Sequence, residues 1–170
     1  MDKKLLISSE TIKKRVKELA TQISLDYEGK NPVLIGVLKG VVFFLADLAR
    51  ELSISTEIDF VRAASYGAGT TSSRNVRLTK DIETSVHGKP VILVEDIVDT
   101  GLTLTHIIQE IGKKGPESIK ICALIEKLER QDIKIPIDYC GFQIKEGFII
   151  GYGLDYDEKY RNLPDLYVLR

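Results

Sequence analysis

The stretch VILVEDIVDTGLTL, residues 91–104, joins an apolar run to a dense polar patch. The apolar run lacks polar alternation, which predicts a strand over 91–94 that is buried on both faces. Apolar residues then recur at helical spacing, which predicts a helix over 102–114. The residues at the junction are carboxylates, hydroxyls and a glycine: Glu95, Asp96, Asp99, Thr100, Gly101 and Thr103. A strand that passes directly into a helix is a building unit of α/β folds.

The same unit is expected on both sides of this stretch. Apolar runs predict strands at 33–38 and 118–125, and alternating residues rich in β-branched types predict another at 56–63. Helices are predicted over 41–52 and after the N-cap candidates Ser8 and Ser9. This alternation predicts an α/β fold whose central, mainly parallel sheet has helices on both faces.

The remaining segments are shorter or irregular. Residues 64–75 are small and polar, and loops of that length inside a compact domain are often functional. Segments 76–79 and 82–86 are expected to form the far arm of that excursion. Short strands are predicted at 137–142, 148–154 and 166–169.

Composition limits the classes of function. With 170 residues, 44% of them hydrophobic and 29% charged, the chain fits one globular domain. Its net charge of −1 predicts no general attraction to nucleic acid or membranes. The opening residues MDKKLLISSE hold no apolar run of signal-peptide or membrane-span length, so a cytoplasmic protein is expected. Cys122 and Cys140 are expected to be reduced core thiols, and His87 and His106 to be structural or surface residues.

Charged side chains are expected to meet at one rim of the sheet. They come directly after predicted strands: Lys39, Glu95, Asp96 and Lys127. In open α/β sheets, ligands bind beyond the carboxyl ends of the strands.

The junction at 99–103 suits a phosphorylated ribose. Unpaired N–H groups at a helix start attract a phosphate, Gly101 allows close backbone approach, and the threonines add hydroxyl donors. Ribose hydroxyls can donate to Glu95 and Asp96, and Mg²⁺ would relieve the repulsion between carboxylates and phosphate. Neither a Walker loop nor a dinucleotide-binding glycine motif is present here.

VILVEDIVDTGLTL resembles the phosphoribosyl-pyrophosphate (PRPP) signature of type I phosphoribosyltransferases. Its Glu-Asp-x-x-Asp-Thr-Gly form is most similar to the 6-oxopurine branch, the hypoxanthine-guanine phosphoribosyltransferases. The resemblance extends to GVLKG (36–40), SYG (65–67), Lys127, GFIIGYGLDY (147–156) and YRNLP (160–164). It implies one domain over 1–170, with a core near 30–135, a hood from 136–170 and the N-terminal residues, and a mobile lid near 64–80.

The resemblance implies a Mg²⁺-dependent transfer of the 5-phosphoribosyl group from PRPP to hypoxanthine or guanine, and it also assigns roles. Asp99 is the implied general base. The ribose-phosphate residues are Glu95, Asp96, Ile97, Val98, Asp99, Thr100, Gly101, Leu102 and Thr103. The pyrophosphate residues are Lys39, Gly40, Arg161, Ser65 and Tyr66, and Leu38-Lys39-Gly40 resembles a family loop that contains a non-proline cis peptide bond. The purine residues are Lys127, Phe148, Ile149 and Asp155. The metal residues are Glu95, Asp96 and Asp155.

Two segments depart from the family pattern. EKLER (126–130) replaces the usual Asp-Lys-Pro, and Arg74 stands where a glycine is common. The alternatives left open are a sister transferase for xanthine or uracil and a PRPP-binding regulator. A homodimer or homotetramer is expected from the family, and no nucleic acid or membrane partner.

Overall fold

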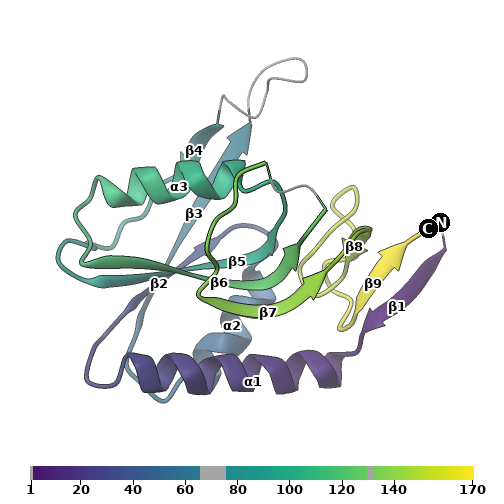
Figure 1. The fold of residues 1–170 in the computed structure, drawn as a ribbon, viewed down its shortest axis with the longest axis horizontal. Coiled ribbons are helices and arrows are strands. Elements are labelled where there is room, and N and C mark those ends of the chain that lie inside the picture. Colours follow the sequence, from purple (N-terminus) through teal and green to yellow (C-terminus); the bar gives the residue numbers. More distant parts are fainter. Residues whose placement is uncertain (1, 66–75, 130–131) are drawn as a thin grey trace.

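The computed structural model describes residues 2–65, 76–129 and 132–170, which form two β-sheets with helices packed against the larger one (Figure 1). The helices are α1 (Ser9–Asp26), α2 (Val42–Glu51) and α3 (Leu102–Gly112). The larger sheet has the order β4-β3-β2-β5-β6-β7. Its strands are β2 (Val33–Val37), β3 (Glu57–Ser65), β4 (Val76–Lys80), β5 (Pro90–Val98), β6 (Ser118–Lys127) and β7 (Tyr139–Ile144). The smaller sheet has the order β1-β9-β8, built from β1 (Lys3–Ile7), β8 (Phe148–Ile150) and β9 (Leu166–Leu169).

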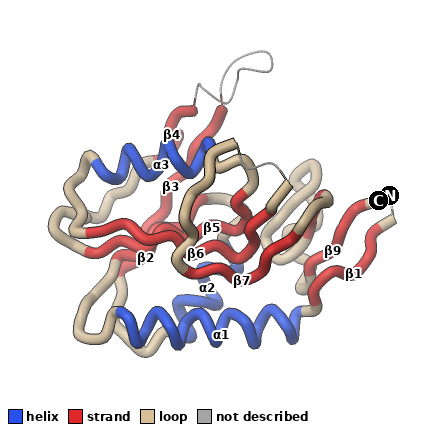
Figure 2. Tube along the Cα trace, in the orientation of Figure 1, coloured by secondary structure: helices blue, strands red, loops and turns tan. Residues whose placement is uncertain are grey.

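The larger sheet is covered on both faces, as expected (Figure 2). Successive side chains of a strand point to opposite faces, and β2 shows this directly. Leu34 packs in the cluster that includes α1 and α2, whereas Val33 and Ile35 pack in the cluster that includes α3. All pairs from β3 to β7 across this sheet are parallel, and only β4 runs antiparallel, against β3. The predicted fold class is therefore confirmed.

The strands that carry the polar patch are longer than their apolar runs. β5 continues through Val98 because its parallel pairing with β6 continues, with Glu95 opposite Ala123 and Val98 opposite Glu126. The sequence predicted that Glu95, Asp96 and Lys127 follow the strands. They lie instead inside the ends of β5 and β6. Backbone ladder bonds do not depend on side-chain polarity, so the change from apolar to charged residues did not mark the strand end.

The smaller sheet and the last core strand differ in detail from the sequence prediction. β1 pairs with β9, Lys3 opposite Leu169, so the N-terminal residues join the C-terminal segment as expected, but in a strand that was not predicted. β7 pairs in parallel with β6, so the core sheet extends past residue 135 and takes in the start of the segment assigned to the hood. Segment 148–154 is a strand only to Ile150, because Gly151 and Gly153 have φ of +96° and +101°.

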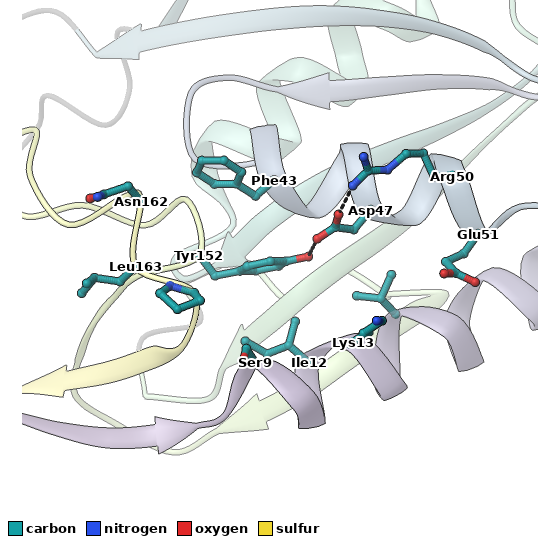
Figure 3. Close-up of a pocket in the computed structure, with 12 residues that line it drawn as sticks. Ser9, Ile12, Lys13, Phe43, Asp47, Arg50, Glu51, Tyr152, Asn162 and Leu163 are labelled. Atoms are coloured by element: carbon teal, nitrogen blue, oxygen red, sulfur yellow. Dashed lines mark hydrogen bonds and ion pairs between the residues drawn. The ribbon is translucent and has the colours of Figure 1, made fainter.

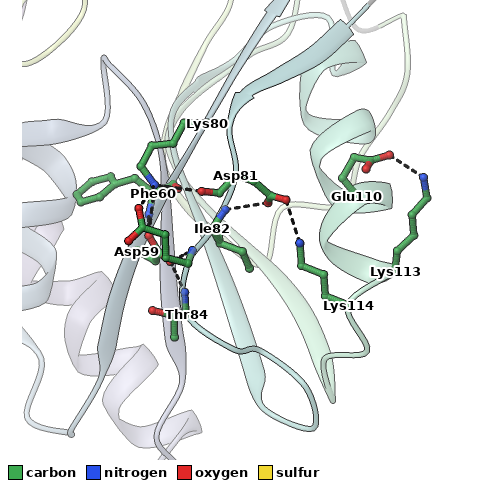
Figure 4. A network of polar contacts seen from close by, with 10 residues as sticks. Asp59, Phe60, Lys80, Asp81, Ile82, Thr84, Glu110, Lys113 and Lys114 are labelled. Atoms are coloured by element: carbon green, nitrogen blue, oxygen red, sulfur yellow. Dashed lines mark hydrogen bonds and ion pairs between the residues drawn. The ribbon is translucent and has the colours of Figure 1, made fainter.

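A polar network holds the base of the β3–β4 arm (Figure 4). Asp59, 9% exposed, accepts hydrogen bonds from the backbone N–H groups of Phe60, Glu83 and Thr84 at 2.7–2.8 Å. Lys80 lies 3.7 Å from its carboxylate. Burial alone would raise the pKa of Asp59, but the three N–H donors and Lys80 bring it below its ordinary value. Residues 82–86, expected in the far arm of the excursion, form a loop that supplies two of these donors.

The arm itself agrees with the sequence prediction, and its tip lies outside the described residues. β4 pairs antiparallel with β3, with Ser65 opposite Val76. Tyr66 and Arg74, predicted for the lid, fall in the segment that the structure does not describe. The mobile lid therefore stays a prediction.

Candidate active site

A cavity of about 120 Å³ lies at the junction of β5 and α3. Most of the predicted ribose-phosphate residues line it, together with Leu104: Glu95, Ile97, Val98, Asp99, Thr100, Gly101 and Thr103. Asp96 and Leu102 do not line it. The first N–H groups of α3 lack helical partners and make this end of the helix suited to an anion.

Gly101 shapes this junction. It is the N-cap of α3 with φ of +82°, and a Cβ atom there would lie 2.5 Å from the carbonyl oxygen of Ile133. Both the left-handed conformation and the close approach of the backbone at Ile133 require glycine. The Thr100 hydroxyl accepts a hydrogen bond from the N–H of Leu102 at 3.3 Å, which fixes the turn into the helix.

The second acid of the patch packs against the loop that follows β2. A Cβ atom at Gly40 would overlap the Asp96 carboxylate, and one at Gly153 would overlap the carbonyl oxygen of Gly40. Three segments that are far apart in the sequence therefore meet with no space for a side chain between them. The peptide bond between Leu38 and Lys39 is cis, as the resemblance implied.

Glu95 and Asp96 form a pair of carboxylates next to this contact. Glu95 is 8% exposed and accepts a hydrogen bond from the backbone N–H of Asp96 at 3.1 Å. Burial raises the pKa of Glu95 well above its ordinary value, and the neighbouring Asp96 charge raises it further. The pair therefore resists holding two negative charges, and a cation or hydroxyl donor at this place would relieve it.

The predicted pyrophosphate residues Lys39 and Arg161 lie in one polar cluster with the predicted metal residue Asp155. The Arg161 guanidinium donates to the carbonyl oxygen of Gly153 at 2.7 Å and lies 3.3 Å from Asp155 Oδ1. Lys39 Nζ lies 3.1 Å from Glu158 Oε2, and Glu158 Oε1 lies 3.4 Å from Arg161. Ser65 ends β3, its side chain is not described, and it stays a predicted contact.

Two polar atoms of the site are buried without a partner. Within the described ranges, the buried side-chain atoms that lack a hydrogen bond are Tyr27 Oη, Asp99 Oδ1 and Arg161 Nε. Such atoms are uncommon in folded proteins, and an acceptor on Asp99 and a donor on Arg161 are what a bound substrate would use. The other oxygen of Asp99 lies 3.7 Å from Lys127 Nζ.

The predicted purine residues present an exposed aromatic face. Phe148 is 51% exposed, and the Tyr156 ring meets it edge-on at 5.6 Å between centroids. Ile149 is buried, so its side chain does not take part in this exposed face. An exposed Phe held by a second ring can stack on a flat base.

The carboxylates fit a metal ion that arrives with substrate. Among the described residues, no three or more His, Cys, Asp or Glu side chains gather to hold a metal ion. Mg²⁺ keeps several waters and is commonly bound by one or two carboxylates together with substrate phosphates. The Glu95–Asp96 pair offers two carboxylates at one place and Asp155 offers one beside Arg161.

A larger pocket, of about 530 Å³, lies away from these residues, between α1, α2 and the turn before β9 (Figure 3). None of the predicted site residues lines it. Across it, the Tyr152 hydroxyl donates to Asp47, which also pairs with Arg50 at 2.6 Å. The candidate site, by contrast, combines a smaller cavity with a rim of charged residues.

Sequence reasoning did not single out Tyr156 or Glu158. Both belong to a reversal between β8 and β9 in which Asp157, Glu158 and Tyr160 have positive φ. Residues of these types seldom adopt that conformation, so no local pattern predicted where their side chains would point. The sequence signal for an irregular backbone in this region was the GYG motif (151–153), since glycine permits positive φ and close backbone approach.

Comparison with known proteins agrees with this geometry. Residues 6–157 match the family model described as phosphoribosyl transferase domain. A hypoxanthine-guanine phosphoribosyltransferase of Bacillus subtilis (strain 168) is 43% identical, over 98% of this chain and 93% of its own length. A hypoxanthine-guanine-xanthine phosphoribosyltransferase of Tritrichomonas foetus is 42% identical, over 98% of this chain and 91% of its own. The crystal structure of a hypoxanthine-guanine phosphoribosyltransferase from Bacillus anthracis has a TM-score of 0.94 at 46% identity, covering 98% of both chains.

This chain therefore belongs to the phosphoribosyl transferase domain family. Its sheet order, its cavity at the β5–α3 junction and its match to solved structures agree with that membership. The family expected from the sequence is confirmed.

Proposed function

We propose that this protein transfers the 5-phosphoribosyl group of PRPP to hypoxanthine or guanine, yielding IMP or GMP and pyrophosphate, in purine salvage. The observation that carries the proposal is the β5–α3 junction. There a cavity at a helix N-terminus lies beside the buried, unpartnered oxygen of Asp99. Relatives that carry these substrates in their names align over nearly the whole chain.

The reaction joins a purine ring nitrogen to C1 of the ribose while pyrophosphate leaves. Asp99 accepts the purine proton through its unpartnered oxygen, and its charge stabilises the positive charge that develops on the ribose. The 5′-phosphate binds the N–H groups at the start of α3, and the ribose hydroxyls donate to Glu95 and Asp96. These roles use acceptors and donors that lie on one rim of the sheet.

Lys127 selects the base in this proposal. Its ammonium can only donate, which suits the 6-oxygen of hypoxanthine or guanine and opposes the 6-amino group of adenine. Adenine would set a donor against this donor, and a mismatch of that kind strongly disfavours the base. Phe148 stacks on the ring, and the backbone at Ile149 meets its edge.

Lys39 and Arg161 hold the pyrophosphate, and Arg161 Nε is a buried donor without a partner among the described residues. Ser65 and Tyr66 are proposed to close over it, which would keep water away from the ribose cation. Mg²⁺ would neutralise charge on the phosphate oxygens, with Glu95, Asp96 and Asp155 as its protein ligands. Proton transfer rests on Asp99 and base selection on Lys127.

Ultraviolet-monitored turnover with PRPP and Mg²⁺ tests the proposal, offering hypoxanthine, guanine, xanthine, adenine and uracil in parallel. Turnover of hypoxanthine or guanine, with adenine and uracil inert, is the expected result. Xanthine is a specific second candidate, since the relative from Tritrichomonas foetus carries xanthine in its name. PRPP binding without turnover of any base would replace the proposal with a regulatory protein.

A homodimer or homotetramer in the cytoplasm completes the proposal. Val42 and Phe43 on α2 are 42% and 41% exposed, and large apolar side chains at that exposure suit a contact between copies. No helix in the described part of the chain is both long and apolar enough to cross a membrane. Sedimentation analysis of the purified protein tests the oligomeric state.

A further inference from the structure

The Glu158 carboxylate spans the two basic side chains of the proposed pyrophosphate site. Its Oε2 accepts from Lys39 Nζ at 3.1 Å, and its Oε1 lies 3.4 Å from the guanidinium of Arg161. One anion with two oxygens thus contacts one lysine and one arginine, which is the pattern expected of neighbouring phosphate oxygens. An exposed glutamate is ionised at neutral pH, so the Glu158 side chain, 64% exposed, carries the negative charge that this pairing requires.

The backbone holds Glu158 in this place. Asp157 and Glu158 have φ of +51° and +59°, a conformation that such residues rarely adopt. The reversal is closed by paired hydrogen bonds between the backbones of Tyr156 and Lys159 at 3.0–3.1 Å. The N–H of Glu158 also donates to Asp155 Oδ2 at 2.9 Å. Unusual backbone conformations that the surroundings enforce are often found at functional sites.

Arg161 has further contacts that hold it in position without Glu158. Its guanidinium donates to the carbonyl oxygen of Gly153 at 2.7 Å and lies 3.3 Å from Asp155. Its Nε stays buried and without a protein partner. Removing the Glu158 charge should therefore leave the guanidinium in place and free part of it for phosphate oxygens.

We propose that the Glu158 carboxylate is an internal competitor of pyrophosphate: it pairs with Lys39 and Arg161 between turnovers, is displaced when the pyrophosphate group binds, and returns as pyrophosphate leaves. This inference rests on the proposed function, because it takes Lys39 and Arg161 as the pyrophosphate ligands. Its role is one of positioning, since it acts through the two basic residues.

Internal competition weakens binding of the free ligand. When only a fraction of the protein has its site available, the apparent dissociation constant is the intrinsic one divided by that fraction. Neutralising Glu158 should therefore tighten pyrophosphate binding, by about threefold to tenfold for a site that Glu158 occupies most of the time. It should also slow pyrophosphate release, which lowers kcat where release limits turnover.

Calorimetric titration with inorganic pyrophosphate and Mg²⁺ tests this on wild type, Glu158→Gln, Glu158→Ala and Asp157→Asn. Asp157 is the matched control, because it is the adjacent exposed carboxylate and its ion pair is with Lys159, at 3.6 Å. Both Glu158 variants should bind pyrophosphate about threefold to tenfold more tightly than wild type, with Asp157→Asn within about twofold.

Unchanged or weaker binding by the Glu158 variants would overturn the inference. An equal gain in Asp157→Asn would overturn it too, because the effect would then come from overall charge. Lys39→Ala separates this failure from that of the proposed function. If wild type binds pyrophosphate, Lys39→Ala weakens that binding and Glu158→Gln has no effect, the inference alone fails. If wild type neither binds pyrophosphate nor turns over any base, the proposed function fails as well.

Discussion

The Asp99→Asn variant removes the proposed base and little else. Asparagine has the size of aspartate but cannot take up a proton at neutral pH. Asp99 Oδ1 is buried and has no partner in the described protein, so no neighbouring donor competes with a substrate proton for it. The substitution therefore separates proton acceptance from the shape of the β5–α3 junction.

The expected losses differ greatly in size. A positioned general base contributes about 10²–10⁴-fold to rate, and that range corresponds to about 3–5.5 kcal/mol in the activation barrier. The structural loss is the contact with Lys127 at 3.7 Å, in which the Asp99 side chain is 40% exposed and the Lys127 side chain 12% exposed. Because water reaches Asp99 and the charges are not in direct hydrogen-bond contact, this pair contributes about 1 kcal/mol to folding. The variant should lose most of its kcat and keep nearly all of its stability.

Steady-state kinetics at saturating PRPP, with hypoxanthine and guanine, measure the effect on kcat. PRPP affinity by calorimetry and the unfolding midpoint by circular dichroism should both stay close to wild type. Asp157→Asn, which removes an exposed carboxylate on the C-terminal segment, should leave kcat unchanged. A kcat for Asp99→Asn within tenfold of wild type, with PRPP still bound, would refute Asp99 as the base.

Three further variants test other parts of the structure. Gly153→Ala should destabilise the fold by about 1–3 kcal/mol, because φ is +101° and the new Cβ would overlap the Gly40 carbonyl oxygen; a thermal midpoint equal to wild type would contradict the close packing. Asp59→Asn should cost about 1–3 kcal/mol at pH 7 in urea unfolding, since a buried carboxylate with three backbone donors is replaced. Because folding lowers the pKa of Asp59, its charge stabilises the fold above the ordinary carboxyl pKa, and this stabilisation is lost as the pH falls through the folded pKa. The free energies of unfolding of wild type and variant should therefore converge in acid. A difference between them that persists in acid would be inconsistent with a role for this charge. Phe148→Ala should weaken purine binding by about 1–3 kcal/mol through lost stacking, with little change in stability because the ring is 51% exposed; an unaltered purine KM would remove Phe148 from the site.

Much of the fold follows from short apolar runs. Val33, Ile35 and Leu34 are all fully buried but lie in clusters on opposite faces of the sheet, which is why an unbroken run predicts a central strand. Ser8 was predicted as an N-cap, and its hydroxyl accepts a hydrogen bond from the N–H of Thr11 at 3.2 Å. These features are local, so the sequence alone predicts them.

Features that depend on distant partners were missed. β1 is largely exposed and is a strand because it pairs with β9 at the other end of the chain. Cys140, expected in the core beside Cys122, is only half-buried, on the last strand of the larger sheet, where one edge has no neighbouring strand. Sequence patterns carry the periodicity of an element but not the identity of its neighbours.

The candidate site shows the same division. The residues of the β5–α3 junction are contiguous in sequence, and a chemical argument about phosphate and ribose identified them together. The contacts of Lys39 with Glu158 and of Phe148 with Tyr156 join segments through a reversal with positive φ. Family resemblance placed Lys39 and Phe148, but their partners required the structure.

The two sheets divide the site between them. The larger sheet carries the proposed ribose-phosphate cavity, and β8 of the smaller sheet carries the proposed Phe148 platform (Figure 1). The loops that follow β2 and β8 touch where Gly153 meets Gly40. Exchanging the segment from β8 to Tyr156 between relatives would therefore change the stacking face while leaving Lys127, at the end of β6, and the sugar-phosphate half untouched. Such a graft would have to keep the glycine at 153, since that point of contact aligns the two halves.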